Sequence, residues 1–172
     1  MHFYRRDFQV HTPRDQQWKG PKAVTEEERV AYASRFVRAC REKGIQAVAI
    51  TDHHCMTFLP FMRKAALDAP GPVGTALLPH QRLIVFPGIE LKLGVPCQAI
   101  VIFDADFPND MFSLALNVLE ITQIDPSAAM AGDPTRLAAI TTFTELKRKL
   151  DEHEYLNDRY IILPNVSGEG EH

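Results

Sequence analysis

The sequence predicts an α/β fold whose strands form a mainly parallel sheet, either open or closed into part of a barrel. Segments of strand length alternate along the chain with segments of helical periodicity. The run at 45–51 (IQAVAIT) is largely apolar, which is typical of a strand buried on both faces of a parallel sheet. Polar residues follow the predicted strands, at the edge where parallel α/β folds place their functional groups.

The predicted strands are neighbours in the sheet and lie at residues 3–10, 45–51, within 82–93, 97–103 and 160–166. The first helix is predicted to start at Thr25, where Glu28 completes a capping box, and to end at Gly44. Further helices are predicted at 57–67, 109–120 and 142–153, and a loop is predicted at 126–134.

The bulk properties suit one globular domain in a reducing compartment. The chain has 172 residues, of which 45% are hydrophobic, and its formal net charge is −3. This balance excludes a uniformly basic nucleic-acid binder. Three widely spaced cysteines do not make a disulfide framework, and no segment approaches the roughly 18 apolar residues of a membrane span. We therefore expect a cytoplasmic protein with no membrane partner.

Basic residues nevertheless gather in the first segment, which contains Arg5, Arg6, Arg14, Lys19 and Lys22 against only Asp7 and Asp15. The plain interpretation is a solvated basic face. The functional interpretation is attraction of a phosphate group toward this segment. In that case Arg14 would steady the phosphate during catalysis, and Lys19 is a further candidate for binding it.

Metal-binding residue types follow the predicted strands. The strand ends carry His11, then Asp52 with His53 and His54, then Glu90, Asp104 with Asp106, and Asn165. Imidazole and carboxylate together suit zinc, manganese and iron. We expect His11, Asp52, His53 and Glu90 to bind metal, with Asp104 and His172 as weaker candidates, and we assign catalytic roles to Glu90, Asp52 and Arg14.

Each of these residues also has a structural interpretation. A lone histidine such as His11 is often a hydrogen-bonded core residue, and Glu90 could cap backbone amides in a loop. Aspartates such as Asp104 commonly end strands as turn residues. The consecutive run from Asp52 to His54 after an apolar strand is the hardest to explain structurally, and it is the strongest indication of a metal site.

At these positions the sequence resembles the PHP family, named after polymerase and histidinol phosphatase domains. The matching segments are FQVHT at 8–12, ITDHH at 50–54 and FPGIE at 86–90. The resemblance implies a distorted (β/α)7 TIM-like barrel that holds up to three metal ions and hydrolyses phosphate esters or nucleic acid. It also implies that residues 1–172 form the N-terminal part of such a domain, with the remainder beyond residue 172.

The family pattern is only partly kept. Gln9 stands at the first histidine of the family's His-x-His motif, and the run Leu163-Pro164-Asn165 stands where the family's fifth strand often ends in His-Pro. Thr51, Asp52 and His53 match the Thr-Asp-His motif, and Glu90 matches the glutamate that bridges metals. The nearest match to a metal-binding histidine after the fourth strand is Asp104, and the family's last Asp-x-His pair would lie beyond residue 172.

Two functions follow as expectations. The first is a phosphoesterase or nuclease that acts through metal-activated water, with one to three manganese, zinc or iron ions. The second is a degenerate module that serves as an interaction or regulatory domain of a larger protein, because Gln9 and Asn165 stand in place of imidazoles. The first segment resembles PHP domains that precede an ATPase domain in bacterial proteins. Amidohydrolase-like enzymes are a third class, but they typically use a metal-bridging lysine, and no predicted strand here ends in lysine.

Overall fold

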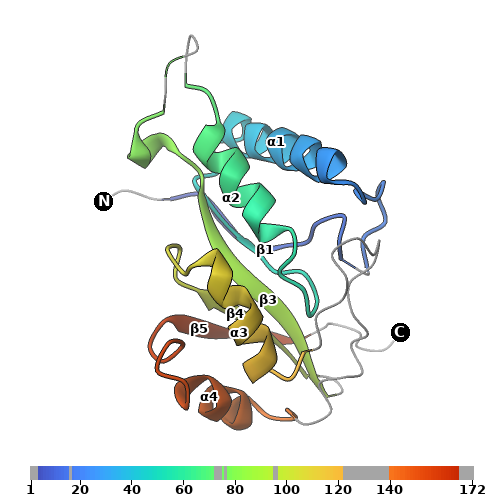
Figure 1. The fold of residues 1–172 in the computed structure, drawn as a ribbon, viewed down its shortest axis with the longest axis vertical. Helices are drawn as coiled ribbons and strands as arrows, with labels where there is room; N and C mark the ends of the chain where they lie inside the picture. The colour runs from blue at the N-terminus through green and yellow to red at the C-terminus, as the bar shows by residue number, and fades with distance from the viewer. Residues whose placement is uncertain are drawn as a thin grey trace.

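The computed structural model describes residues 4–15, 17–71, 75, 77–94, 97–121 and 140–166. Its strands are β1 (Arg6–Val10), β2 (Ala47–Ile50), β3 (Ile84–Gly94), β4 (Cys97–Phe103) and β5 (Tyr160–Val166). Its α-helices are α1 (Glu26–Glu42), α2 (Leu59–Asp68), α3 (Phe112–Val118) and α4 (Phe143–Asp151). These elements form a mixed α/β fold around one curled sheet (Figure 1). The predicted loop at 126–134 and His172 lie outside the described residues.

Helix boundaries follow the capping residues that the sequence offers. The backbone N–H of Glu28 donates to the Thr25 hydroxyl at 3.2 Å, and the Glu28 carboxylate accepts from the backbone N–H of Thr25 at 3.0 Å. This confirms the predicted capping box at the start of α1. After α1 the chain turns through Gly44 in the left-handed region, at φ 68°. The hydroxyl of Thr142 caps α4 in the same way as Thr25 caps α1.

The sheet is mixed, which corrects the prediction of a mainly parallel sheet. The strand order is β1-β2-β3-β4-β5, and β1, β2 and β3 pair in parallel as expected. In contrast, β4 runs antiparallel to both β3 and β5. The reason is the connection, since residues 95–96 alone separate β3 from β4. A parallel crossover needs about a dozen residues, so a two-residue link forces a hairpin.

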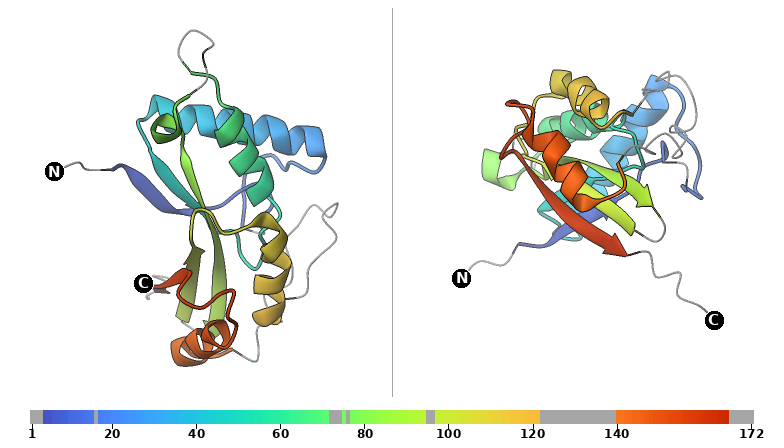
Figure 2. Two further views of the ribbon diagram at one scale, coloured as in Figure 1. Left: turned by 60° about the vertical axis from the view of Figure 1, so that its left-hand side comes forward. Right: turned by 90° about the horizontal axis from the view of Figure 1, so that it is seen from below.

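The helices cover one face of the sheet, as two further views show (Figure 2). Side chains alternate along β3, so that Leu91 and Leu93 join the large core under the helices. Glu90 and Lys92 lie on the opposite face of β3, which also carries a smaller apolar cluster of Phe8, Ala49, Phe86, Ile100, Ile102 and Leu163. Among the described residues, no helix is long and apolar enough to cross a membrane.

Gly88 sits where β3 approaches its two neighbours most closely. A Cβ atom at this position would lie 2.8 Å from Cγ2 of Thr51, 3.0 Å from the carbonyl oxygen of Ile50 and 3.2 Å from that of Val101. Two of these three contacts are with backbone, which cannot rotate away. The small residue therefore lets β3 pair closely on both sides, just before Glu90.

We predict that Gly88→Ala destabilises the protein by about 1–3 kcal/mol, the usual cost of overpacking. Urea denaturation of wild type and variant measures the change. Gly44→Ala is the matched control, because a Cβ there meets nothing within 4 Å and only the left-handed φ is disturbed. That control is expected to cost roughly 1 kcal/mol. A smaller loss for Gly88→Ala than for the control would contradict the close approach.

Candidate metal centre

Three predicted residues converge where the carboxyl ends of β1 and β2 lie beside the middle of β3. Nε2 of His11 lies 3.3 Å from Oε2 of Glu90, and Nε2 of His53 lies 3.7 Å from Oε1 of the same carboxylate. The two imidazole rings stack with their centroids 5.1 Å apart and their planes 7° apart. His53 and Glu90 are buried, whereas the His11 side chain is 27% exposed. Within the described part of the chain, the three groups therefore form one cluster that is exposed at His11.

Backbone hydrogen bonds at the strand ends bring these residues together. The N–H of Thr51 donates to the carbonyl of Val10 at 2.8 Å, and the N–H of Glu90 donates to the carbonyl of Asp52 at 3.2 Å. An isolated parallel bridge then pairs His53 with Glu90 beyond the regular end of β2. The parallel register of β1, β2 and β3 thus places the three side chains at one level.

His54, the third residue of the run, has a structural contact instead. Its backbone is left-handed at φ 52°, a conformation that is uncommon for residues other than glycine. Its backbone N–H donates to the carbonyl of Glu90 at 3.1 Å, and its Nε2 accepts from the backbone N–H of Lys92 at 3.2 Å. His54 therefore holds β3 at Glu90 and at Lys92.

Asp15 is the residue of this site that the sequence analysis missed. Its Oδ2 lies 3.1 Å from Nδ1 of His11 and 2.9 Å from Nδ1 of His53, and it accepts the backbone N–H of His53 at 2.7 Å. Asp15 is fully buried. Burial opposes its ionisation, but hydrogen bonds from His11 and His53 hold the pKa of this carboxyl well below its usual range. One buried carboxylate therefore orients both imidazoles.

This arrangement charges His11 in the absence of a cation. The hydrogen bond to Asp15 raises the pKa of His11 to about 10, and the hydrogen bond to Glu90 adds to the effect. The Glu90 carboxyl is itself buried, which disfavours its charge. Even so, hydrogen bonding to His11 and the charge of His53 lower the pKa of Glu90 overall. The raised pKa of His11 and the lowered pKa of Glu90 both describe an ion pair between these two side chains.

Asp52 is committed to the loop that carries His11. Its Oδ1 accepts the backbone N–H of Thr12 and its Oδ2 accepts the Thr12 hydroxyl, each at 2.6 Å. Burial raises the pKa of Asp52 to about 7. Asp52 also forms a second cluster with His11 and Asp15, whose nearest donor atoms lie within 4.8 Å of one another. Because both of its oxygens accept from Thr12, the main contact of Asp52 joins the end of β2 to the loop after β1.

The cluster of His11, His53 and Glu90 has the donor set of a divalent metal site. An ionised carboxylate only accepts hydrogen bonds, so Nδ1 of His11 and Nδ1 of His53 both donate to Asp15. In the neutral form of each ring, Nε2 then carries a lone pair that can bind a metal ion. Nε2 of His53 is buried and has no hydrogen-bond partner among the described residues. Two ligand atoms on a tetrahedral ion at about 2.1 Å lie about 3.4 Å apart, close to the observed nitrogen–oxygen separations. The residues present therefore fit a metal ion.

Asp104 does not reach this cluster, which corrects its assignment as a weak metal candidate. The assignment assumed that all five strands end at one edge, but β4 is antiparallel and delivers Asp104 to the opposite edge. There Oδ2 of Asp104 accepts from Nε of Arg159 at 3.1 Å, and Asp106 pairs with the same guanidinium at 3.0 Å. In contrast, β5 runs parallel to β3, so Asn165 does arrive beside Glu90.

The predicted phosphate-binding residues are placed differently from one another. Arg14 is 1% exposed. Burial of Arg29 lowers the pKa of that residue, and the positive charge of Arg14 lowers it further. The guanidinium of Arg14 therefore lies near a second buried arginine and away from the surface. Lys19 is exposed on the same loop. Lys92, which the sequence analysis did not select, is half-buried and lies two residues beyond Glu90 on the same face of β3.

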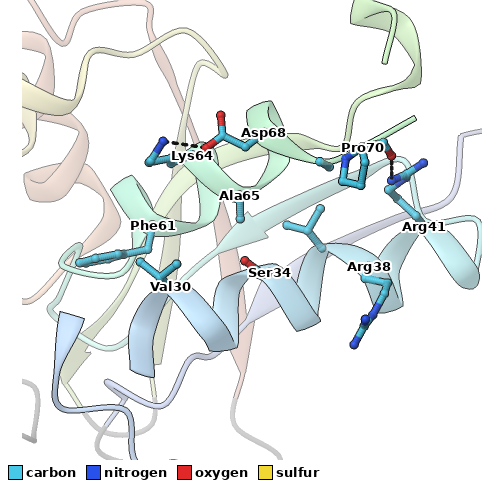
Figure 3. Close-up of a pocket in the computed structure, with 11 residues that line it drawn as sticks. Val30, Ser34, Arg38, Arg41, Phe61, Lys64, Ala65, Asp68 and Pro70 are labelled. Carbon is cyan, nitrogen blue, oxygen red and sulfur yellow. Dashed lines mark hydrogen bonds and ion pairs between the residues drawn. The ribbon is translucent and has the colours of Figure 1, made fainter. Parts of the chain in front are cut away.

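A separate groove of about 330 Å³ runs between α1 and α2 and contains none of the cluster residues (Figure 3). Its apolar lining includes Val30, Phe61 and Ala65. On its rim Lys64 pairs with Asp68 at 2.6 Å, and Arg41 donates to the carbonyl of Pro70 at 2.7 Å. Lys64, Asp68 and Arg41 are thus already engaged with the protein itself, whereas Arg38 is drawn on the same rim without such a contact to a described residue.

Comparison with solved structures finds a similar chain from Bifidobacterium adolescentis that is provisionally described as a metal-dependent phosphoesterase. The match has a TM-score of 0.34 and 18% sequence identity, and it covers 64% of this chain. This chain spans about a third of that protein, because the match covers 32% of it. No family model and no curated protein matches the sequence.

We predict that Asp15→Asn weakens the binding of zinc or manganese about 10–100-fold, because an amide no longer orients both imidazoles as a charged acceptor. Isothermal titration calorimetry on the folded variant measures the affinity. Asp110→Asn, an exposed change in the turn before α3, is the control and is expected to leave the affinity unchanged. Equal affinities for Asp15→Asn and wild type would show that Asp15 does not support a metal site.

A second prediction concerns pH and the metal-free protein. The pKa of His11 is raised from 6.5 to about 10, so its ion pair stabilises the fold fully below its ordinary pKa and is lost as the pH rises through about 10. The difference in unfolding free energy between wild type and His11→Gln should therefore shrink from about pH 7 to about pH 10. Chemical denaturation in the presence of a chelator measures both proteins. A difference that grows with pH would refute the ion pair.

Proposed function

We propose that the chain is a metal-dependent phosphoesterase of the PHP type, with its centre at His11, His53 and Glu90. The convergence of two imidazole Nε2 atoms on one buried carboxylate carries the proposal. The proposal includes the fold, in which the five strands form the first part of a distorted (β/α)7 barrel. It is supported by the parallel pairing of β1, β2 and β3 and by the position of the cluster at the carboxyl ends of β1 and β2.

Each side chain of the cluster has a separate role in the proposed reaction. When bound, a divalent ion would lower the pKa of a water molecule and polarise a phosphoryl oxygen. His11 and His53 provide neutral nitrogen donors, which Asp15 holds in one tautomer through both Nδ1 atoms. Glu90 provides a negative donor and offsets part of the cation's charge. The exposed side of His11 leaves room for substrate, while burial of His53 keeps bulk water from the other side.

The phosphate group of a substrate needs a cationic partner outside the metal cluster. We assign this role to Lys92, because it follows Glu90 on the same face of β3. Burial lowers the pKa of His54, and the charges of His53 and Lys92 lower it further, so the charge of Lys92 acts close to the cluster. Lys19 adds positive charge at the exposed loop. Arg14 supports this loop from inside, since its guanidinium is buried. Both phosphate monoesters and nucleic-acid phosphodiesters fit this chemistry, and activity assays distinguish them.

A second function is favoured by one specific observation. The side-chain amides of Gln9 and Asn165 donate to the Glu90 carboxylate at 3.2 Å and 2.9 Å. These contacts, with His11, satisfy Glu90 without a cation, as a module that has lost catalysis would require. Such a module would serve an interaction or regulatory role within a larger protein that contains an ATPase domain. Absence of divalent metal binding would favour this second function.

We predict that Glu90→Gln abolishes manganese- or zinc-dependent hydrolysis in the full-length protein while the fold is retained. The substitution keeps the shape of the side chain but removes the charge that faces both imidazoles. Turnover of a generic phosphodiester, a phosphate monoester, single-stranded DNA and RNA is measured with each metal, and circular dichroism checks the fold.

His80→Ala is the control for this experiment, because His80 is exposed in a short turn before β3 and belongs to neither described cluster. It should retain wild-type turnover. Wild-type turnover in Glu90→Gln would overturn the catalytic role of the cluster. No turnover in wild type with any of these metals and substrates would shift the assignment to the regulatory module.

A further inference from the structure

The Glu90 carboxylate is approached by four nitrogen atoms, two at each oxygen. Its Oε2 lies 3.2 Å from Nε2 of Gln9 and 3.3 Å from Nε2 of His11. Its Oε1 lies 2.9 Å from Nδ2 of Asn165 and 3.7 Å from Nε2 of His53. Each oxygen therefore has one amide neighbour and one imidazole neighbour. The amides come from β1 and β5, the two edge strands of the sheet.

The contacts determine which end of each amide faces Glu90. An ionised carboxylate only accepts hydrogen bonds, so the NH₂ group of an amide must point toward it. Asn165 has a further constraint, because its Nδ2 also lies 3.4 Å from Oε1 of Gln98. Nδ2 of Asn165 thus faces two acceptor oxygens. If the amide were flipped, its own oxygen would face these two oxygens and be repelled by them. Both amides present hydrogens, and neither presents an oxygen, to the carboxylate.

These contacts limit how many cations Glu90 can bind. Each carboxylate oxygen has about two lone-pair directions. At each oxygen one direction is taken by an amide hydrogen, and the other is left on the side of the imidazole rings. An ion between His11, His53 and Glu90 uses only the remaining directions. A second ion on the same carboxylate would have to displace an amide, whose hydrogens carry positive partial charge and repel a cation.

The second cluster, of His11, Asp15 and Asp52, is already engaged in hydrogen bonds, because both oxygens of Asp52 accept from Thr12 and Asp15 accepts from both imidazoles and from Gln17. We propose that the centre holds a single divalent ion, and that Gln9 and Asn165 are positioning residues that prevent Glu90 from bridging to a second ion. This inference rests on the metal-binding function proposed above. It departs from the resemblance described earlier, which implies up to three ions and a metal-bridging glutamate. The departure follows from the hydrogen bonds of Gln9 and Asn165 and not from the mere replacement of two histidines.

The test measures metal stoichiometry, which does not depend on activity. Full-length protein is freed of metal with a chelator, dialysed against manganese and analysed for bound manganese per chain by mass spectrometry. Electron paramagnetic resonance then distinguishes an isolated manganese ion from a coupled pair. Glu90→Gln provides the background of unspecific binding. We expect one ion per wild-type chain above this background, with the spectrum of an isolated ion.

The variant Gln9→Glu/Asn165→Asp tests the role of the two amides. Each change replaces an NH₂ donor by a carboxylate oxygen of the same shape, so a second cation gains ligands where it was repelled. We expect this double variant to bind one more ion than wild type and to show the spectrum of a coupled pair. Gln81→Glu/Asn157→Asp is the matched control, because both residues are exposed and neither contacts Glu90. It should bind the same number of ions as wild type.

The outcomes separate this inference from the proposed function. Two or more coupled ions in wild type would overturn the single-ion centre but leave the metal-dependent function intact. No binding above the Glu90→Gln background would refute the metal site and with it both proposals. One ion in both wild type and the folded double variant would show that Gln9 and Asn165 do not control the number of ions. If the double variant fails to fold, the wild-type count alone still decides for or against a single ion.

Discussion

The buried carboxylate of Asp15 is the interaction on which the rest of the site depends. It is hydrogen-bonded to two imidazoles from different strand ends, and its charge determines both their tautomer and the direction of their Nε2 atoms. A buried charge is stable only when it is paired and hydrogen-bonded, and Asp15 meets this condition through His11, His53 and the backbone N–H of Gln17. The loop after β1 must therefore close over the end of β2. The contact between Asp52 and Thr12 holds it there.

The sheet brings His11 and His53 to Glu90 from one side and Asn165 from the other. Parallel pairing of the first three strands aligns His11, His53 and Glu90, while the hairpin after β3 reverses the chain. Because β5 then runs parallel to β3 again, its end brings Asn165 to the same carboxylate from the far edge. One face of the sheet thus combines an apolar cluster at its middle with polar contacts at one end. The fully covered face carries the helices and the main core.

Local signals in the sequence predicted local structure well. The capping box at Thr25, the strand at 160–166 and the level of His11, His53 and Glu90 all follow from short-range patterns and parallel pairing. The predicted direction of β4 was wrong because an apolar run does not indicate which way a strand runs. Only the two-residue link after Gly94 indicates that β4 must run antiparallel to β3. Asp15 was missed because its role depends on contact with His53, 38 residues away, and a loop aspartate among basic residues looks like a simple counter-charge. Lys92 was missed because alternation along β3, and not a motif, puts it beside Glu90.

The contacts of Glu90 also bear on how the protein reaches its native state. Gln9 is 81 residues before Glu90 in the sequence, and Asn165 is 75 residues after it. Contacts between such distant residues form late, since the chain entropy of closing long loops is lost before they stabilise anything. The carboxylate acquires its complete set of neighbours only after both edge strands have docked. A nascent chain in which β5 has not yet been synthesised therefore exposes a half-formed anionic pocket, and cations present during synthesis meet that pocket before the Asn165 amide does.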